Sequence, residues 1–194
     1  HTTIMLLNYY KIQYLIVTKS DMIAMDEYIN IYDKSLAHFQ VTITSTNDIT
    51  SLSYEKAPST SKRIQAIEKL QNYGFDVSVR LSPYIYENID VSILDGIGCN
   101  KILIEFLKVN HWVKKWFNID YSPYSLSYGG YDHLQLDHKI KLVSKITGFE
   151  QVSVGEYVKD HYEYFRDNVN HNKTDCCNLS NIITQQEIEQ TTLF

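Results

Sequence analysis

The chain has 194 residues, which is enough for one domain with a buried core. Hydrophobic residues make up 44% and charged residues 21%, an ordinary globular composition, and the net charge of −5 argues against a protein that holds nucleic acid by bulk charge alone. No apolar run approaches the roughly 20 residues that a membrane helix needs, so we expect no membrane association.

Short apolar runs alternate with helical patterns along the chain. The first half is predicted to hold a helix end over 1–10, a strand over 13–18, a helix over 21–37, a strand over 39–44, a polar loop over 46–58 and a helix over 59–73. The second half is predicted to hold a strand over 77–81, a short helix over 91–94, a strand over 101–106, one or two helical turns over 111–117, a loop over 121–131, a helix over 132–147, a short strand over 150–154 and a helix over 156–165.

This alternation predicts an α/β fold, because strands that alternate with helices form a parallel sheet with both faces buried. Four or five strands are too few to close a barrel, so we expect a partial, open βα barrel. In barrels of this kind, chemistry gathers where the strands end. The polar residues at the expected strand ends are Lys19, Thr44, Arg80 and Ser82.

The ends of the chain suggest a piece of a longer protein. The first residue is His1 rather than methionine, and 2–10 reads as a helix without a beginning, so we expect truncation at the N-terminus. We divide the chain into a barrel part over 1–175 and a polar tail over 176–194. Three cysteines, two of them adjacent at Cys176 and Cys177, do not suggest a disulfide framework, so we expect a reducing cytoplasm.

A series of short motifs follows the predicted elements. In order they are Thr18-Lys19, Thr42-Ile43, Glu55-Lys56, Lys62-Arg63, Ala66, Gly74 and Pro83. With this series the chain resembles the radical S-adenosylmethionine proteins of the spore photoproduct lyase type over roughly residues 1–180. The order of the motifs carries the resemblance; no single motif does.

The resemblance implies a partial α/β barrel and an enzyme that cleaves S-adenosylmethionine reductively at a 4Fe–4S cluster. The resulting 5′-deoxyadenosyl radical abstracts hydrogen from a substrate, here left open, with a nucleic-acid base as one possibility. Three cysteines in a C-x3-C-x2-C loop hold the cluster in that family, and this chain has no such loop. We therefore expect the cluster ligands upstream of His1, no metal ligands within the chain, and an inactive fragment.

Five residues are candidates for cofactor binding. On the resemblance, Lys19 contacts the cofactor carboxylate; the alternatives are a solvated lysine before a helix or a Schiff-base lysine. Thr42 and Thr44 share one face of their strand and match polar positions that line the cofactor, although threonine also favours strands by propensity. Arg80 and Ser82 also share a face, and Arg80 is expected either to bind an anion or to pair with Glu105.

Two further features left alternatives open. The segment 110–116 combines tryptophans, lysines and a histidine, which could stack on bases and touch phosphates or form a partly buried amphipathic helix. Cys176 and Cys177 could bind metal or be redox-active, but unpaired thiols are the simpler interpretation. For the whole chain, the alternative to an enzyme fragment is an inactive half-barrel that serves as a binding or scaffold module.

Overall fold

The computed structural model describes residues 1–175. Its strands are β1 (Tyr14–Thr18), β2 (Ala37–Ile43), β3 (Asp76–Tyr84), β4 (Lys101–Phe106), β5 (Leu126–Tyr128), β6 (Tyr131–His133) and β7 (Gln151–Gly155). Its α-helices are α1 (Thr2–Tyr9), α2 (Asp26–Ile29), α3 (Asp48–Tyr54), α4 (Thr60–Asn72), α5 (Val91–Asp95), α6 (Val113–Trp116), α7 (Leu136–Val143) and α8 (Lys159–Asn168).

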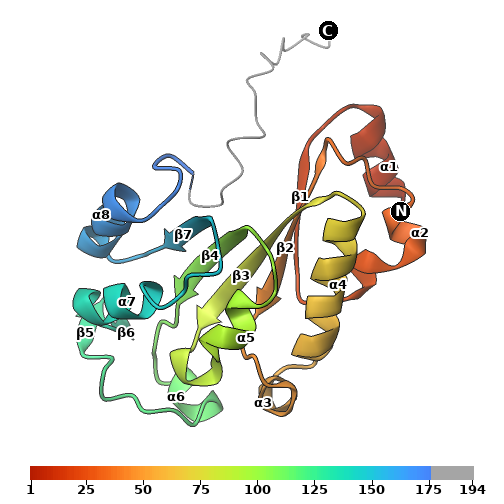
Figure 1. Cartoon of the computed structure of the whole chain (residues 1–194). Helices are drawn as coiled ribbons and strands as arrows, with labels where there is room; N and C mark the ends of the chain where they lie inside the picture. Colours follow the sequence, from red (N-terminus) through yellow and green to blue (C-terminus); the bar gives the residue numbers. More distant parts are fainter. Residues whose placement is uncertain (176–194) are drawn as a thin grey trace, which may run out of the picture.

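Five of the strands form one sheet in the order β1-β2-β3-β4-β7, and every neighbouring pair is parallel (Figure 1). The sheet does not close on itself. This confirms the predicted α/β fold with an open, partial βα barrel. All four long strand predictions and the short fifth strand correspond to members of this sheet.

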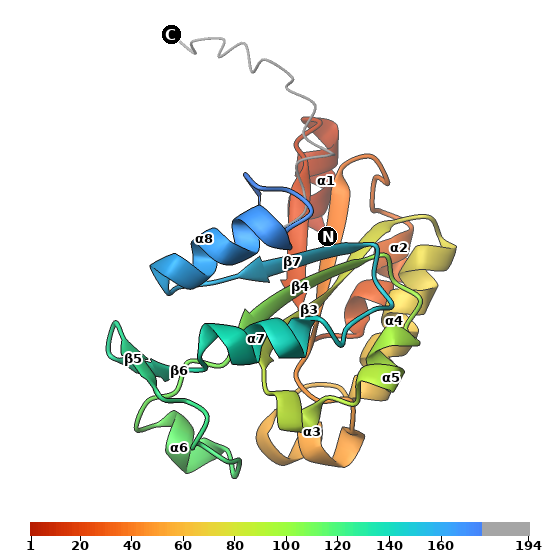
Figure 2. The ribbon, with the colours of Figure 1, turned by 60° about the vertical axis from the view of Figure 1, so that its left-hand side comes forward.

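One face of the sheet is apolar and carries the helices. Figures 1 and 2 show α4, α5 and α7 along this side. The strand residues that point to it are nearly inaccessible to solvent: Phe39, Val41, Ile43, Val77, Val79, Leu81, Ile102, Ile104 and Val154. Helix α4 buries Ala66, Ile67 and Leu70 against them, at the spacing of an amphipathic helix. Gly74 follows the end of α4 with φ of +82°, a backbone conformation that stops a helix.

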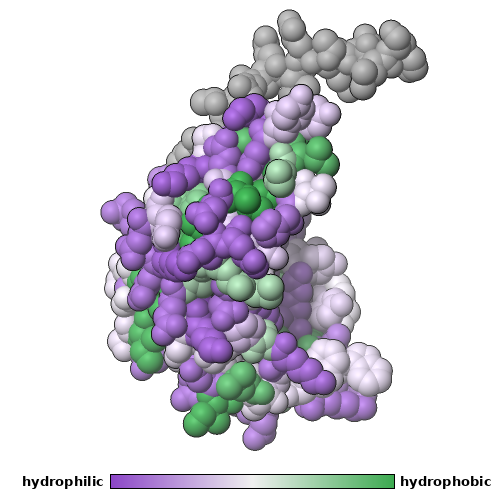
Figure 3. Space-filling view, turned by 90° about the vertical axis from the view of Figure 1, so that its right-hand side faces the viewer, coloured by the Kyte–Doolittle hydropathy of each residue, from purple (hydrophilic) through white to green (hydrophobic). Residues whose placement is uncertain are grey.

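The opposite face of the sheet is polar. Beside the apolar Leu15, Val17 and Leu103, alternation along each strand and the parallel register assign to it the polar residues His38, Gln40, Thr42, Asp76, Ser78, Arg80, Ser82, Lys101, Glu105, Gln151 and Ser153. We call these residues the polar face. Parallel sheets covered by helices on both sides usually have two apolar faces, whereas this second face is mostly polar although β2 is buried along its whole length. Figure 3 shows a recess with hydrophilic side chains at the right of the view.

Three predicted segments differ from the structure. The expected helix over 21–37 is a 3-10 turn at Met22–Ala24 followed by the single turn of α2, because Met25 is extended and the Asp33 carboxylate accepts from the Ser35 N–H and starts a turn. The polar segment 46–58 is not all loop. It contains α3, which begins where the Asn47 side chain accepts from the Thr50 N–H at 3.0 Å.

The third difference lies between 121 and 147. Part of the expected loop and the start of the expected helix form the β5–β6 hairpin. Gly129 and Gly130 make its turn with φ of +59° and +82°, the backbone that a tight two-residue hairpin requires. Helix α7 therefore begins at Leu136 rather than at 132.

Candidate cofactor-binding site

Lys19 lies directly after β1, at the carboxyl end of the sheet. Its ammonium group donates to Glu55 Oε1, and its side chain stays 38% exposed, whereas that of Glu55 is 7% exposed. Lys19 is therefore not a lysine surrounded only by solvent, which was one of the alternatives. A Schiff-base lysine has to be desolvated, whereas Lys19 is partly exposed and engaged by a carboxylate, so this arrangement does not suit the Schiff-base alternative.

Glu55 joins the two strand ends to α4. Besides Lys19, its Oε1 accepts from the Thr44 hydroxyl at 2.9 Å, and its Oε2 accepts from the Arg63 guanidinium. Thr44 directly follows β2, and its carbonyl accepts from the Tyr54 hydroxyl at 3.1 Å. The segment between α3 and α4 thus places one carboxylate beneath two strand ends.

Arg63 is a fully buried side chain. Its Nε donates to the Pro58 carbonyl at 2.8 Å and its Nη1 to the Thr42 carbonyl at 3.0 Å. Together with the pair to Glu55, these bonds satisfy the guanidinium on three sides and hold it behind the end of β2. A buried cation needs such partners, because an unpaired charge in a protein interior is strongly unfavourable.

Two opposing effects set the pKa of Glu55. Burial alone would raise it, but the hydrogen bonds from Lys19, Arg63 and Thr44 and the charge of Arg63 outweigh burial, and the pKa lies below its ordinary value. Glu55 is therefore a carboxylate at neutral pH, and the pair with Lys19 is an ion pair.

The remaining candidates lie on the polar face. Thr42 and Arg80 are register partners on β2 and β3, and Ser82 follows on the same face of β3. Arg80 Nε donates to Glu105 Oε2 at 2.8 Å, so the expected cross-strand pair is confirmed. Both side chains stay partly exposed, at 25% and 36%. The structure thus brings Lys19, Thr42, Thr44, Arg80 and Ser82 to the carboxyl half of one sheet surface.

A second polar network lies at the amino end of the same face. Asp76 accepts from Lys101 at 2.7 Å and lies 3.1 Å from His38 Nδ1. Burial would raise the pKa of Asp76, but these hydrogen bonds outweigh it and the pKa is lowered. The network therefore ties neighbouring strands together at the amino end of the polar face.

A buried ion pair follows β7. Lys139 of α7 is fully buried and donates to Glu156, and its Nζ lies 3.1 Å from His161 Nδ1. Burial, reinforced by the charge of Lys139, lowers the pKa of His161. The sequence pattern indicates no partner for His161; the fold supplies Lys139 of α7. In the part of the chain that the structure describes, no group of three side chains could hold a metal ion.

The aromatic and basic segment 110–116 is largely exposed. Asn110 caps α6 by accepting from the Trp112 and Val113 N–H groups. Trp112 and Trp116 are 58% and 67% exposed, and Lys115 lies 4.8 Å from the Trp112 ring centroid. Val113 and Phe117 pack partly buried against the core, as in the expected partly buried amphipathic helix, while the two tryptophan rings stay exposed. The Cys176–Cys177 pair lies outside the described residues.

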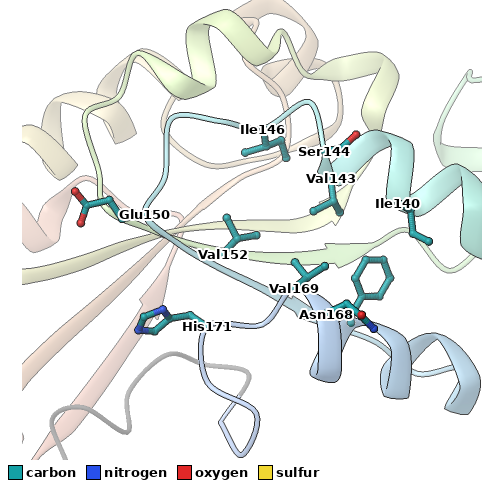
Figure 4. A pocket seen from close by; sticks show the side chains of 10 residues that line it. Ile140, Val143, Ser144, Ile146, Glu150, Val152, Asn168, Val169 and His171 are labelled. Atoms are coloured by element: carbon teal, nitrogen blue, oxygen red, sulfur yellow. The ribbon is translucent and has the colours of Figure 1, made fainter.

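A cavity of about 360 Å³ lies elsewhere, on the helix side of the sheet (Figure 4). The cavity lies between α7 and α8 and next to β7. Its walls include Ile140, Val143, Val152, Phe165 and Val169. Because these side chains are apolar and none belongs to the strand ends, this cavity is not the candidate site. No helix among residues 1–175 is both long and apolar enough to cross a bilayer.

Sequence reasoning found the strand-end residues but not the role of Glu55. The signal was present, since Glu55 belongs to the motif series, but its partners could not be read from the sequence. Lys19 is 36 residues away, and Arg63 points back from a helix on the other side of the sheet.

Comparisons with known proteins agree with this fold. No family model matches the chain, and no curated protein matches it in sequence. Three solved structures of spore photoproduct lyase variants match: a tyrosine-to-phenylalanine variant and a cysteine-to-serine variant at a TM-score of 0.51 and 13% identity, and a cysteine-to-alanine variant at 0.50 and 14%. Each match covers 79% of this chain and 48% of the lyase chain.

At this identity the likeness shows the fold. The chain has a partial α/β barrel of the kind found in spore photoproduct lyase, and it spans about half the length of the lyase chains it matches.

Proposed function

We propose that this chain is the S-adenosylmethionine-binding half of a radical S-adenosylmethionine enzyme. One observation carries the proposal. The five candidate residues from the strand ends, two of which belong to the motif series, lie together at the carboxyl half of the polar face, in a parallel sheet with the fold of spore photoproduct lyase: Lys19, Thr42, Thr44, Arg80 and Ser82. A purely structural sheet would not need a polar surface there.

The donors present fit the cofactor. Lys19 is a partly exposed ammonium group at a strand end and suits the carboxylate of S-adenosylmethionine. Thr42 and Ser82 offer hydroxyl groups on the neighbouring strands for its polar atoms. The Arg80–Glu105 pair presents one positive and one negative group in the centre of the face, so it can orient a polar ligand without adding net charge.

The cluster itself requires additional polypeptide. A 4Fe–4S cluster bound to three cysteines would supply the electron that cleaves the cofactor. The outer edge of β1 supports a longer sheet, because β1 pairs on one side with β2 and is the last strand in the order. Beside it, α1 leaves Met5 and Leu6 more than half exposed. We propose that a preceding segment continues the sheet here and brings the cysteines.

We propose nucleic acid as the substrate. The exposed rings of Trp112 and Trp116 and the adjacent Lys114 and Lys115 are the groups that bind unpaired bases and phosphates. Lys114 also contacts Asp132 of the β5–β6 hairpin at 3.1 Å, which ties this surface to the region beyond the strand ends. A reducing compartment such as the cytoplasm suits an iron–sulfur enzyme.

The test is an activity assay, first on the parent protein and then on two of its variants. The parent protein with its upstream sequence is assayed for 5′-deoxyadenosine under reducing, anaerobic conditions, and we expect product. Lys19→Met should abolish at least nine-tenths of it, because the carboxylate loses its cation, an effect of about 1.5–3 kcal/mol. Lys62→Met, which removes an exposed lysine from α4, is the matched control. An intact cluster with no product refutes the enzyme; cofactor binding without product supports the binding-module alternative.

A further inference from the structure

The group of charged side chains at the ends of β1 and β2 has more positive than negative charges. Lys19 and Arg63 are two cations that share the single carboxylate of Glu55. Of these three side chains, Arg63 is fully buried, Glu55 is 7% exposed and Lys19 is 38% exposed. The excess positive charge is therefore accessible at Lys19, where one further anion could be bound.

Glu55 is held in place without Lys19. Its Oε2 pairs with Arg63, and its Oε1 also accepts from Thr44 at 2.9 Å. Arg63 is fixed in turn by the carbonyls of Pro58 and Thr42. If Lys19 turned toward an external anion, Glu55 would lose one of three partners and remain a satisfied, buried carboxylate. The loss of folding stability is small because the buried contacts between Glu55, Arg63 and Thr44 stay intact.

We propose that Glu55 is an internal carboxylate that occupies Lys19 in the free chain and is displaced there by the carboxylate of the ligand. The inference rests on the proposed function, since it concerns the same lysine. Glu55 thereby lowers the affinity for a carboxylate ligand, which has to displace it, and leaves the affinity for a ligand without a carboxylate unchanged. Only a ligand that offers its own carboxylate can replace the contact that Lys19 loses, so a ligand without one gains nothing from Lys19.

The experiment compares two probes on the full chain by isothermal titration: S-adenosylmethionine and decarboxylated S-adenosylmethionine. The dissociation constant of the decarboxylated probe divided by that of S-adenosylmethionine measures how strongly the chain recognises the carboxylate. The key variant is Glu55→Gln combined with Arg63→Met, because it removes the competitor together with its buried cation and leaves the net charge of the cluster unchanged. Glu55→Gln alone and Glu68→Gln, an exposed glutamate on α4, complete the set.

Competition predicts that the ratio rises about fivefold in the double variant, within the range of a partly exposed ion pair, and stays unchanged in Glu68→Gln. An unchanged ratio would show that Glu55 is only structural. A lower ratio would show that Glu55 holds Lys19 in place for the ligand. Either result overturns the inference while leaving the proposed function standing. If the wild-type chain does not favour the carboxylate probe, the proposed function fails, and the inference with it.

A measurement on the wild-type chain covers variants that fail to fold. The ¹³C resonance of the Glu55 carboxylate should shift when S-adenosylmethionine is added and should not shift with the decarboxylated probe. The loss of the Lys19 contact produces the shift. Equal responses to both probes, or none to either, contradict the displacement of Glu55.

Discussion

Arg63 is the residue on which the strand ends most depend. It is fully buried and links Glu55 to the carbonyls of Pro58 and Thr42. Arg63→Met should lower the free energy of unfolding by about 3–5 kcal/mol, the range for removing one partner of a buried ion pair. Urea denaturation measures this change.

Lys62→Met, at the neighbouring exposed position, should change stability by less than about 0.5 kcal/mol. The double variant with Glu55→Gln should recover part of the loss, since it no longer leaves a carboxylate without its cation. If Arg63→Met is as stable as Lys62→Met, the buried pair does not stabilise the fold.

The sequence allowed one of the two strand-end ion pairs to be predicted. Arg80 and Glu105 lie on adjacent predicted strands, so alternation and the order of the sheet place them side by side. The pair between Lys19 and Glu55 could not be predicted, because Glu55 belongs to a connection between two helices. The path of that connection depends on Arg63 and Tyr54, contacts that exist only in the folded chain.

At the scale of elements, the β5–β6 hairpin packs through its turn. A Cβ at Gly129 would lie 2.5 Å from the Tyr157 ring, whereas one at Gly130 meets nothing within 4 Å. Both glycines have positive φ, so alanine is strained at either position. Gly129→Ala should therefore destabilise the chain by about 1–3 kcal/mol more than Gly130→Ala, because it adds overpacking to the same backbone strain.

Thermal unfolding of the two variants gives the difference. Tyr157→Ala should abolish it, since the truncated side chain no longer meets the added methyl group. Equal effects of the two glycine substitutions in the wild-type background would contradict the close packing of Tyr157 on the turn.

Elements formed by a regular pattern were predicted, and elements formed by local hydrogen bonds were not. The strand prediction over 101–106 matches β4, because a continuous apolar run indicates a buried strand. Helix α3 was missed because its polar sequence has no apolar stripe and depends on the Asn47 cap. The helix expected over 21–37 was wrong, since apolar residues at mixed spacing do not define one face.

At the scale of the whole molecule, the sheet separates its apolar and polar residues to opposite sides. The apolar side provides the core that holds the strands in register. The polar side has no comparable core and depends on polar networks at both ends: the ion pairs of Lys19, Glu55 and Arg63 at the carboxyl end, and at the amino end the Asp76–Lys101 ion pair with His38 beside it. The stability of the fold should therefore respond to the charge of two carboxylates.

Glu55 and Asp76 both have a pKa below the ordinary value. A carboxyl group whose pKa is lower in the folded state stabilises the fold at pH values above its unfolded pKa, and this stabilisation is lost as the pH falls through the folded pKa. The free energy of unfolding should decrease slightly as the pH falls through the unfolded histidine pKa of about 6.5, because the pKa of His161 is lowered in the folded chain, and decrease further below about pH 4.5, as the unfolded chain takes up protons on these two carboxylates.

Urea denaturation between pH 3 and pH 7 tests this dependence. Asp76→Asn should reduce stability at neutral pH and make the decrease below about pH 4.5 shallower, because one of the two groups no longer titrates. Asp26→Asn, at an exposed carboxyl group on α2, should leave both the level and the slope near those of the wild type. A wild-type slope that Asp76→Asn does not change would mean that the amino-end network contributes nothing to acid sensitivity, and that the carboxyl-end cluster around Glu55 accounts for it.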